Sequence, residues 1–443
     1  MLIKDKKDFL LGVSTAAAQI EGDDGTQGRG KSIWDTFCDE GKIYQNQNAY
    51  VSIDHYNRFR EDVNLMGDLG VNAYRFSTSW SRLIPNGTGA INQKGVDFYN
   101  KLIDALLDKN IKPVLTLYHW DLPEELSKKG GFENPDFPKW FEDYSELIAK
   151  TYGDRVKFVS SFNEPINIIH SGYYAGNFAP GLKLSERRIL DCMLNLHIAH
   201  GKFAEIFRSS VKDVTIGGFA MSTFEEYPLV VNANTIELTR RKFFEKELCS
   251  ESVDVYLDPI YFGEYPTRIY EKYPDFYERV VKADLKKYVG NTDVMCYNNY
   301  SGMPIDQNGN EARNYLKVEY TDMGRVLDPN GMYWGIKFLI ERYNLPIYVT
   351  ENGLANNDWV FDDGKVHDLN RIEYIKRHLS ILEKIVEENI DVCGYFVWSF
   401  LDNFEWLCGY SQRFGLVHVD FETLKRTPKD SFYWYKEYIA KNK

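Results

Sequence analysis

The segment Phe59-Arg-Glu-Asp-Val-Asn-Leu-Met-Gly-Asp-Leu-Gly-Val-Asn-Ala-Tyr-Arg-Phe-Ser77 joins an expected helix directly to an expected strand. Apolar side chains recur every three or four residues over its first part, at Phe59, Val63, Met66 and Leu69. This period predicts an amphipathic helix, and Gly70 stands where a glycine commonly ends one. The run from Val71 to Ser77 is typical of a buried strand. The segment is therefore one helix–strand unit of an α/β fold.

The same alternation of amphipathic helix and short apolar run continues along the chain. The expected strands are Leu10–Gln19, Val71–Ser77, Val114–Tyr118, Val156–Phe162, Thr215–Phe219, Val294–Tyr300, Ile347–Thr350 and Val392–Trp398. Strands that alternate with helices pair in parallel, because a parallel connection needs a crossover of about a dozen residues or more. Eight such units predict one (β/α)8 TIM barrel domain over residues 1–443. Long βα-loop insertions or extra helices are expected at 21–50, 220–290 and 300–345.

An open, doubly wound sheet is the competing topology. Such sheets commonly carry a glycine-rich turn that binds phosphate groups. The nearest candidate turn, with Gly22, Gly25, Gly28 and Gly30, matches neither the dinucleotide-binding pattern nor the P-loop pattern. The closed barrel is therefore favoured, and no cofactor is expected.

The composition narrows the class of function. The 443 residues carry 53 basic and 65 acidic side chains, and the net charge of −12 argues against nucleic acid as a partner. The six cysteines lack the paired spacing of a zinc site or a disulfide framework. No apolar run reaches the length of a signal peptide or a membrane span. We expect a cytoplasmic protein with no membrane partner, whose oligomeric state, a homo-oligomer included, stays open.

Polar side chains stand at the carboxyl ends of seven of the eight expected strands. In a (β/α)8 barrel these ends meet at one mouth, where the active site is expected. The residues are Gln19, Arg75, His119, Asn163 with Glu164, Asn298 with Tyr300, Glu351 and Trp398. The fifth expected strand offers nothing comparable. A mixture of amide, guanidinium, imidazole and indole groups around one rim indicates a site rather than a solvated surface.

Two of these residues, Glu164 and Glu351, are carboxylic acids that directly follow apolar strands. Glycoside hydrolysis needs one acid to protonate the leaving oxygen and one carboxylate to attack or to activate water. Aromatic residues make up 15% of the chain, enough to fill a large core and also to line a pocket for sugar rings. The pair of glutamates therefore predicts glycoside hydrolysis.

Other chemistries find weaker support in the sequence. His197 and His200 have ligand-like i, i+3 spacing, but no third ligand follows at a recognisable distance, so core packing is expected and no metal. No Gly-x-Ser-x-Gly sequence occurs, which disfavours a serine hydrolase. A sugar-binding protein without turnover would lack one of the two glutamates.

Several motifs, spread nearly from end to end, resemble those of glycoside hydrolase family 1, a family of retaining β-glucosidases and β-galactosidases. They are Gln19-Ile20-Glu21-Gly22, Ser32–Phe37, Tyr74–Ser77, Tyr118–Pro123, Phe162-Asn163-Glu164-Pro165, Thr350-Glu351-Asn352-Gly353, and the stretch from Trp398 through Asp402–Trp406 to Arg413–Leu416. The resemblance implies hydrolysis of terminal β-D-glycosyl residues from small β-glycosides or oligosaccharides, with net retention. It further implies a cis peptide bond between Trp398 and Ser399.

The resemblance also implies roles for the site residues. Glu164 would be the general acid/base and Glu351 the nucleophile. Asn163 and the apolar strand behind Glu164 are expected to raise its pKa, whereas Arg75, Asn298 and Tyr300 are expected to stabilise a charged Glu351. The substrate-binding residues would be Gln19, His119, Asn163, Trp398, Glu405, Trp406 and Phe414, with Trp398 as a stacking floor.

Finer specificity depends on the C-terminal motifs. The branch of the family that acts on 6-phosphoglycosides replaces the pair Glu405-Trp406 and carries lysine and tyrosine about where this chain has Gln412 and Phe414. A phosphate beside Glu405 would meet like charge, so an unphosphorylated sugar is favoured. A 6-phospho-β-glycosidase and an enzyme that mainly transfers glycosyl groups to alcohols are the alternatives. Arg325 replaces a tryptophan that often lines the leaving-group subsite, which leaves aglycone preference open.

Overall fold

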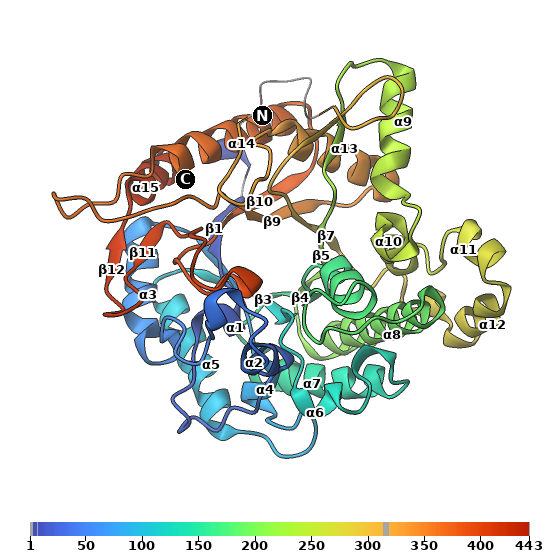
Figure 1. Cartoon of the computed structure of the whole chain (residues 1–443), viewed down its shortest axis with the longest axis horizontal. Coiled ribbons are helices and arrows are strands. Elements are labelled where there is room, and N and C mark those ends of the chain that lie inside the picture. Colours follow the sequence, from blue (N-terminus) through green and yellow to red (C-terminus); the bar gives the residue numbers. More distant parts are fainter. Residues whose placement is uncertain (1–2, 7, 313–318, 443) are drawn as a thin grey trace.

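The computed structural model describes residues 3–6, 8–312 and 319–442 (Figure 1). Eight parallel strands form a closed barrel in the order β1-β10-β9-β7-β5-β4-β3-β2. The strands are β1 Leu10–Ser14, β2 Ala73–Ser77, β3 Lys112–Tyr118, β4 Phe158–Phe162, β5 Thr215–Ser222, β7 Val294–Asn298, β9 Ile347–Asn352 and β10 Val392–Trp398. The predicted (β/α)8 barrel is therefore confirmed.

Helices surround the barrel and also build the long connections (Figure 1). They are α1 Ala17–Ile20, α2 Ile33–Asp39, α3 His55–Leu69, α4 Trp80–Leu83, α5 Gln93–Asp108, α6 Glu124–Ser127, α7 Phe137–Tyr152, α8 Glu186–Ser210, α9 Ala233–Phe244, α10 Val253–Tyr261, α11 Thr267–Lys272, α12 Pro274–Ala283, α13 Asn330–Tyr343, α14 Leu369–Glu387 and α15 Asp430–Asn442. A π-helix, η4, covers Asn167–Tyr174. Of the helices in the described ranges, none is long and apolar enough to cross a membrane.

Helix α3 forms as its apolar spacing predicts. Phe59, Val63, Met66 and Leu69 of α3 are all buried, so the spacing of about 3.6 residues per turn places them on one covered face. Gly70 ends the helix with a φ of 87°, a conformation that glycine adopts without a steric penalty. The chain is thereby redirected into β2.

A plug of apolar side chains fills the barrel on the side opposite the expected mouth. Its members are Leu10, Ala73, Val114, Phe158, Ala220, Val294, Cys296 and Phe396. Gly12 leaves room for it, because a Cβ atom there would lie 2.5 Å from the Phe396 ring. The plug closes the barrel, so any cavity must open at the carboxyl ends of the strands.

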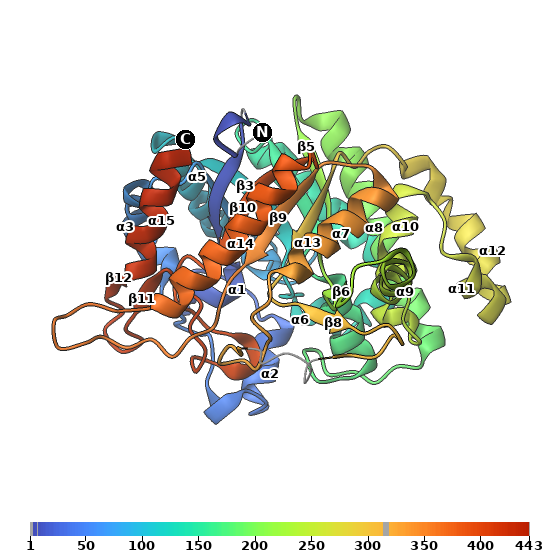
Figure 2. The ribbon, with the colours of Figure 1, turned by 90° about the horizontal axis from the view of Figure 1, so that it is seen from above.

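Parts of the insertions lie at the open end of the barrel, whereas α11 and α12 project to one side (Figure 2). Figure 2 shows α2, β6 (Glu226–Pro228) and β8 (Met303–Ile305) at the end opposite the two marked termini. Strands β6 and β8 form a separate two-stranded sheet, as do β11 (Val417–Val419) and β12 (Arg426–Pro428). The insertions thus wall the mouth.

The first strand is shorter than predicted. β1 ends at Ser14, and the chain turns into the short helix α1, which carries Gln19. The backbone N–H of Ala17 donates a hydrogen bond of 2.8 Å to the hydroxyl of Ser77, which fixes the turn across the top of β2. Gln19 therefore reaches the mouth from a helical turn rather than from a strand end.

Candidate active site

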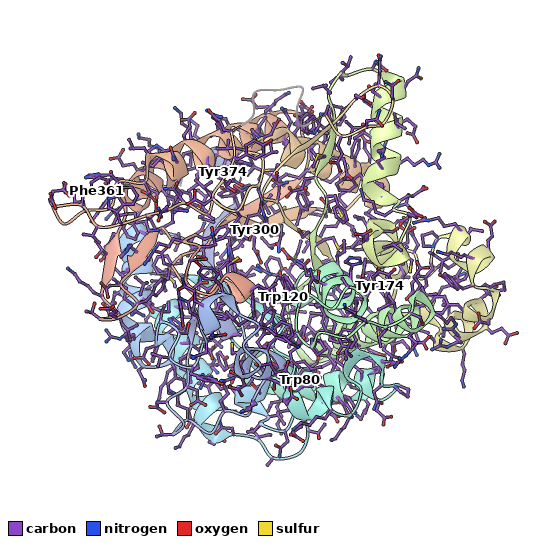
Figure 3. The ribbon with its side chains drawn as sticks, viewed as in Figure 1. Trp80, Trp120, Tyr174, Tyr300, Phe361 and Tyr374 are labelled. Atoms are coloured by element: carbon purple, nitrogen blue, oxygen red, sulfur yellow. The ribbon has the colours of Figure 1, made fainter. Side chains whose placement is uncertain are left out.

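A cavity of about 270 Å³ opens at the carboxyl ends of the strands. Nine of the predicted site residues line it: His119, Asn163, Glu164, Tyr300, Glu351, Trp398, Glu405, Trp406 and Phe414. The other three, Gln19, Arg75 and Asn298, hydrogen-bond to residues of this lining. Figure 3 places the labelled Tyr300 and Trp120 near the centre of the ring of strands. The structure thus brings all twelve predicted residues to one place.

Glu351, in β9, is held as a charged group by two donors. Its Oε1 accepts a hydrogen bond of 2.5 Å from Arg75 Nη1, and its Oε2 accepts one of 2.5 Å from the Tyr300 hydroxyl. Glu351 is 2% exposed and Arg75 is 1% exposed, so water screens this ion pair little. Each oxygen of the Glu351 carboxylate therefore has a donor, and the side chain is held in one orientation.

Arg75, in β2, is itself held from two further sides. Its Nη2 donates to Asn163 Oδ1 at 2.8 Å, and its Nε donates to Thr116 Oγ1 at 3.2 Å. The guanidinium therefore has a fixed orientation, and it presents its remaining N–H group to Glu351. Such a network supplies preorganised charge that does not have to reorient during a reaction.

Glu164, directly after β4, lies in a different environment. Its Oε1 accepts a hydrogen bond of 2.9 Å from Asn298 Nδ2, and its Oε2 accepts one of 2.5 Å from Asn167 Nδ2. Burial, followed by the negative charge of Glu351, raises the pKa of Glu164 to about 7. A carboxyl group with this pKa can hold a proton near neutral pH and then release it.

The structure differs from the sequence prediction at two asparagines. Asn298 donates to Glu164, where a contact with Glu351 was expected, because the Thr350 hydroxyl donates to Asn298 Oδ1 at 2.7 Å and turns the NH₂ group towards β4. Asn163 was expected to raise the pKa of Glu164. The rise comes from burial, as expected from the apolar strand, and from Glu351 rather than from Asn163, and the amide donors Asn298 and Asn167 oppose it.

Asn163 orients His119 at the next strand end. Its Oδ1 accepts from both Arg75 and Asn298, so its Nδ2 is the atom that faces His119 Nε2, at 3.0 Å. An amide NH₂ group can only donate, so Nε2 is the acceptor and Nδ1 carries the ring proton. Burial lowers the pKa of His119 well below its usual value, which keeps the ring neutral.

Gln19 and Glu405 form the opposite wall. Gln19 Nε2 donates to Phe404 O at 2.9 Å and to Glu405 Oε2 at 3.2 Å. Gln19 Oε1 is buried and makes no hydrogen bond to the described part of the chain. Burial is the main cause that raises the pKa of Glu405 to about 8. A buried acceptor and a carboxyl group side by side suit hydroxyl groups of a ligand.

Aromatic rings close the floor and the side of the cavity. His119 stacks with Trp398 at a centroid distance of 5.7 Å and an interplanar angle of 18°, and with Trp406 at 6.1 Å and 17°. The peptide bond between Trp398 and Ser399 is cis, which confirms that prediction. Flat apolar faces beside polar walls are typical of sugar-binding pockets.

Other lining residues were not predicted as site residues. Asn167 begins the π-helix η4, three residues after Glu164, a spacing from which a side chain could have been expected to face the acid. Trp120 lies within the Tyr118–Pro123 motif. The remaining ones are Phe178, Met323, Leu407 and Cys408, which come from long loops whose course the sequence pattern does not reveal, and Arg325, whose position the family resemblance had indicated as part of the leaving-group subsite.

His197 and His200 lie in α8 and away from this cavity. His197 hydrogen-bonds to the Tyr265 hydroxyl at 2.7 Å and to Tyr256 O at 2.9 Å. His200 bonds to the hydroxyls of Ser161 and Thr292. The predicted core packing is confirmed. Within residues 3–6, 8–312 and 319–442, no group of three or more His, Cys, Asp or Glu side chains is arranged to hold a metal ion.

The chain is similar to known proteins over nearly its whole length. It is 41% identical to a 1,4-beta-D-glucan glucohydrolase of Thermotoga neapolitana, with 99% of each chain covered, and 40% identical to Beta-glucosidase A of Acetivibrio thermocellus, with 98% of each covered. Its structure matches that of a family 1 β-glucosidase from Thermotoga maritima with a TM-score of 0.90, at 40% identity over 99% and 98% of the two chains. That Thermotoga maritima β-glucosidase also has a solved structure in complex with glucoimidazole.

A family model also matches nearly the whole chain. The model described as glycosyl hydrolase family 1 matches residues 4–443. This match spans the eight barrel strands, both cavity glutamates and the loops that carry Glu405 and Trp406. The chain belongs to glycosyl hydrolase family 1.

Proposed function

We propose that this protein is a retaining β-glycosidase, with β-glucosidase activity foremost, that releases terminal β-D-glycosyl residues from small β-glycosides. The observation that carries the proposal is the contrast between two carboxyl groups in one cavity. Glu351 is paired with Arg75 and Tyr300, whereas burial raises the pKa of Glu164 to about 7. One is suited to attack as an anion and the other to deliver a proton.

The reaction proceeds in two displacements. Glu351 attacks the anomeric carbon and forms a glycosyl ester while Glu164 protonates the oxygen of the departing group, which breaks the glycosidic bond. Glu164, now ionised, takes a proton from a water molecule, and that water attacks the anomeric carbon and releases Glu351. Each step inverts the anomeric centre, so the released sugar has the configuration of the substrate.

The remaining site residues bind the sugar. Gln19, His119, Asn163, Glu405 and Trp406 offer hydrogen bonds to ring hydroxyls, and the unpartnered Oε1 of Gln19 supports this role. Trp398 provides a stacking floor, and Phe414 lines the cavity beside it. Glu405 and Phe414 present no cation to a 6-phosphate, which favours an unphosphorylated sugar. β-Galactosides and β-fucosides are further candidate substrates.

The product configuration tests this proposal directly. Hydrolysis of 4-nitrophenyl β-D-glucoside is followed by proton NMR before mutarotation, and the first glucose released should be the β-anomer. Initial release of α-glucose would refute the double displacement. The same samples with added methanol measure transfer to alcohol, and predominant methyl glucoside would favour the transglycosylase alternative over hydrolysis.

We also propose that residues 1–443 function as one domain in the cytoplasm. The barrel draws strands from both ends of the chain, which supports the single unit. All six cysteines are unpaired thiols, as expected in a reducing compartment. Antibody labelling of intact cells and of lysed cells tests the location.

A further inference from the structure

A second cavity adjoins the sugar cavity on the side of Glu164. Its volume is about 520 Å³, and its lining includes Phe224, Glu225, Lys242, Lys246 and Met303. Asn167 and Arg325 line both cavities, so they mark the junction between them. The two cavities therefore lie on either side of these two side chains.

The junction lies where a leaving group must pass. Asn167 donates its hydrogen bond to Glu164, the group proposed to protonate the leaving oxygen. A substrate whose sugar occupies the first cavity places that oxygen beside Glu164. The rest of the leaving group then extends past Asn167 and Arg325 into the second cavity.

Arg325 offers an accessible cation at this junction. Its residue is exposed, and its Cζ lies 4.6 Å from the centroid of the Tyr300 ring. A guanidinium over an aromatic face is held by the ring while its N–H edges stay available for a ligand. Tyr300 also donates to Glu351, so the cation lies close to the reaction centre.

Three carboxyl groups that act on Arg325 have raised pKa values. Glu225, Glu164 and Glu405 all act on it electrostatically. Burial raises the pKa of Glu225 and of Glu164 to about 7 each, and that of Glu405 to about 8. A substantial fraction of each group is therefore protonated at neutral pH. Lys246, which also lines the second cavity, is not a comparable cation, because it already forms an ion pair with Glu226.

We propose that Arg325 forms a subsite for a carboxylate on the leaving group, so that the enzyme prefers aglycones bearing an acidic group close to the glycosidic oxygen. The inference rests on the proposed glycosidase function and adds the chemical class of the aglycone. A guanidinium pairs with a carboxylate through two parallel charge-assisted hydrogen bonds, which a neutral aglycone cannot match. Arg325 is thus a specificity-determining residue for the reaction.

Matched aryl glucosides test the subsite. The substrates are 4-carboxyphenyl and 4-carbamoylphenyl β-D-glucoside, nearly equal in size but different in charge, together with the corresponding 3-substituted pair. The readout is the ratio of kcat/KM for the acid to that for the amide. Arg325→Gln should lower this ratio about tenfold for at least one pair, mainly through a higher KM for the acid. Raising the salt to about 0.5 M should weaken the preference of the wild-type enzyme, because the site is open to solvent.

Two further variants make the result decisive. Arg241→Gln removes the same charge from the neighbouring exposed surface of α9, outside both cavities, and should leave the ratio unchanged. Arg325→Met keeps an apolar stem against Tyr300 and should lower the ratio as Arg325→Gln does. An unchanged ratio in both Arg325 variants, or equal losses in Arg241→Gln, would overturn the subsite. Since 4-nitrophenyl β-D-glucoside carries no carboxylate, wild-type failure on it would contradict the glycosidase function instead.

Discussion

The two sides of the catalytic cavity contain the same side chain and give it different properties. At Glu351, the buried Arg75 and the Tyr300 hydroxyl donate hydrogen bonds to the carboxylate. Around Glu164, two neutral amides donate, and burial together with the nearby Glu351 charge favours the protonated acid. The comparison shows that one cavity can give two glutamates different roles through their different partners, an arginine and a tyrosine for one and two amides for the other.

Removing the anion should produce the largest effect. Glu351→Ala leaves no nucleophile, and kcat should fall at least about 10⁴-fold. Added azide can enter the space of the lost side chain and attack from the same face, so it should restore turnover and give the α-glucosyl azide. The measurement is kcat with product analysis by NMR. A folded variant that azide does not rescue would exclude Glu351 as the nucleophile.

Changing the acid should have an effect that depends on the leaving group. Glu164→Gln keeps the shape and removes the proton, and we expect a loss of about 10²–10⁴-fold for alkyl glucosides. The leaving group of an activated aryl glucoside departs without protonation, so the first step of its hydrolysis should be far less affected. The measurement is kcat/KM across a series of leaving groups of rising pKa. Equal losses across that series would show that Glu164 is not the acid.

The donor pair on Glu351 can be weakened without removing the carboxylate. Tyr300→Phe deletes one hydrogen bond to a charged group, and kcat/KM should fall about 10- to 100-fold. Tyr265→Phe is the matched control, because it removes a buried hydroxyl that bonds to His197 and not to the cavity. That control should lower thermal stability while keeping kcat/KM. Similar kinetic losses in both variants would attribute the effect to packing.

The smallest of these effects is the pH dependence that the pKa of Glu164 imposes on kcat/KM. Because the protonated form is the active acid, kcat/KM should fall as pH rises through about 7, by about tenfold per pH unit beyond it. Glu225 has a similar pKa but lies beside Asn299 and the backbone of Tyr300. Glu225→Gln should therefore keep this alkaline limb, and Glu164→Gln should lose it. The reverse pattern would assign the limb to Glu225.

The barrel could be predicted because its strands are short apolar runs between amphipathic helices. Short apolar runs such as Val392–Trp398 are typical of buried strands, so the periodicity of the sequence was sufficient to predict the strands of the barrel. The end of β1 was missed, since Ala16, Ala17 and Ala18 extend an apolar run across a turn that is set by a hydrogen bond to Ser77. A contact with another strand cannot be read from local spacing.

The site shows the same division between local and tertiary information. The site residues at strand ends could be predicted, because a barrel brings the carboxyl ends of its strands together. The hydrogen-bond partner of Asn298 could not be predicted, because it depends on the hydroxyl of Thr350 in β9, which donates to Asn298. Glu225 was also missed, since it follows β5 in a loop and reaches Tyr300 only through the fold. Sequence thus identified which groups gather, and the structure determined which atoms meet.

The hydrogen bonds of Gln19 have a consequence for the order of assembly in the cell. Gln19 is synthesised long before its partners Phe404 and Glu405, which follow nearly 400 residues later. The strand pair β1–β10 closes across the same interval. A nascent chain that has not yet reached residues 392–405 has neither a complete ring nor a place for a sugar. Sugar binding can therefore begin only after residues 392–405 have left the ribosome.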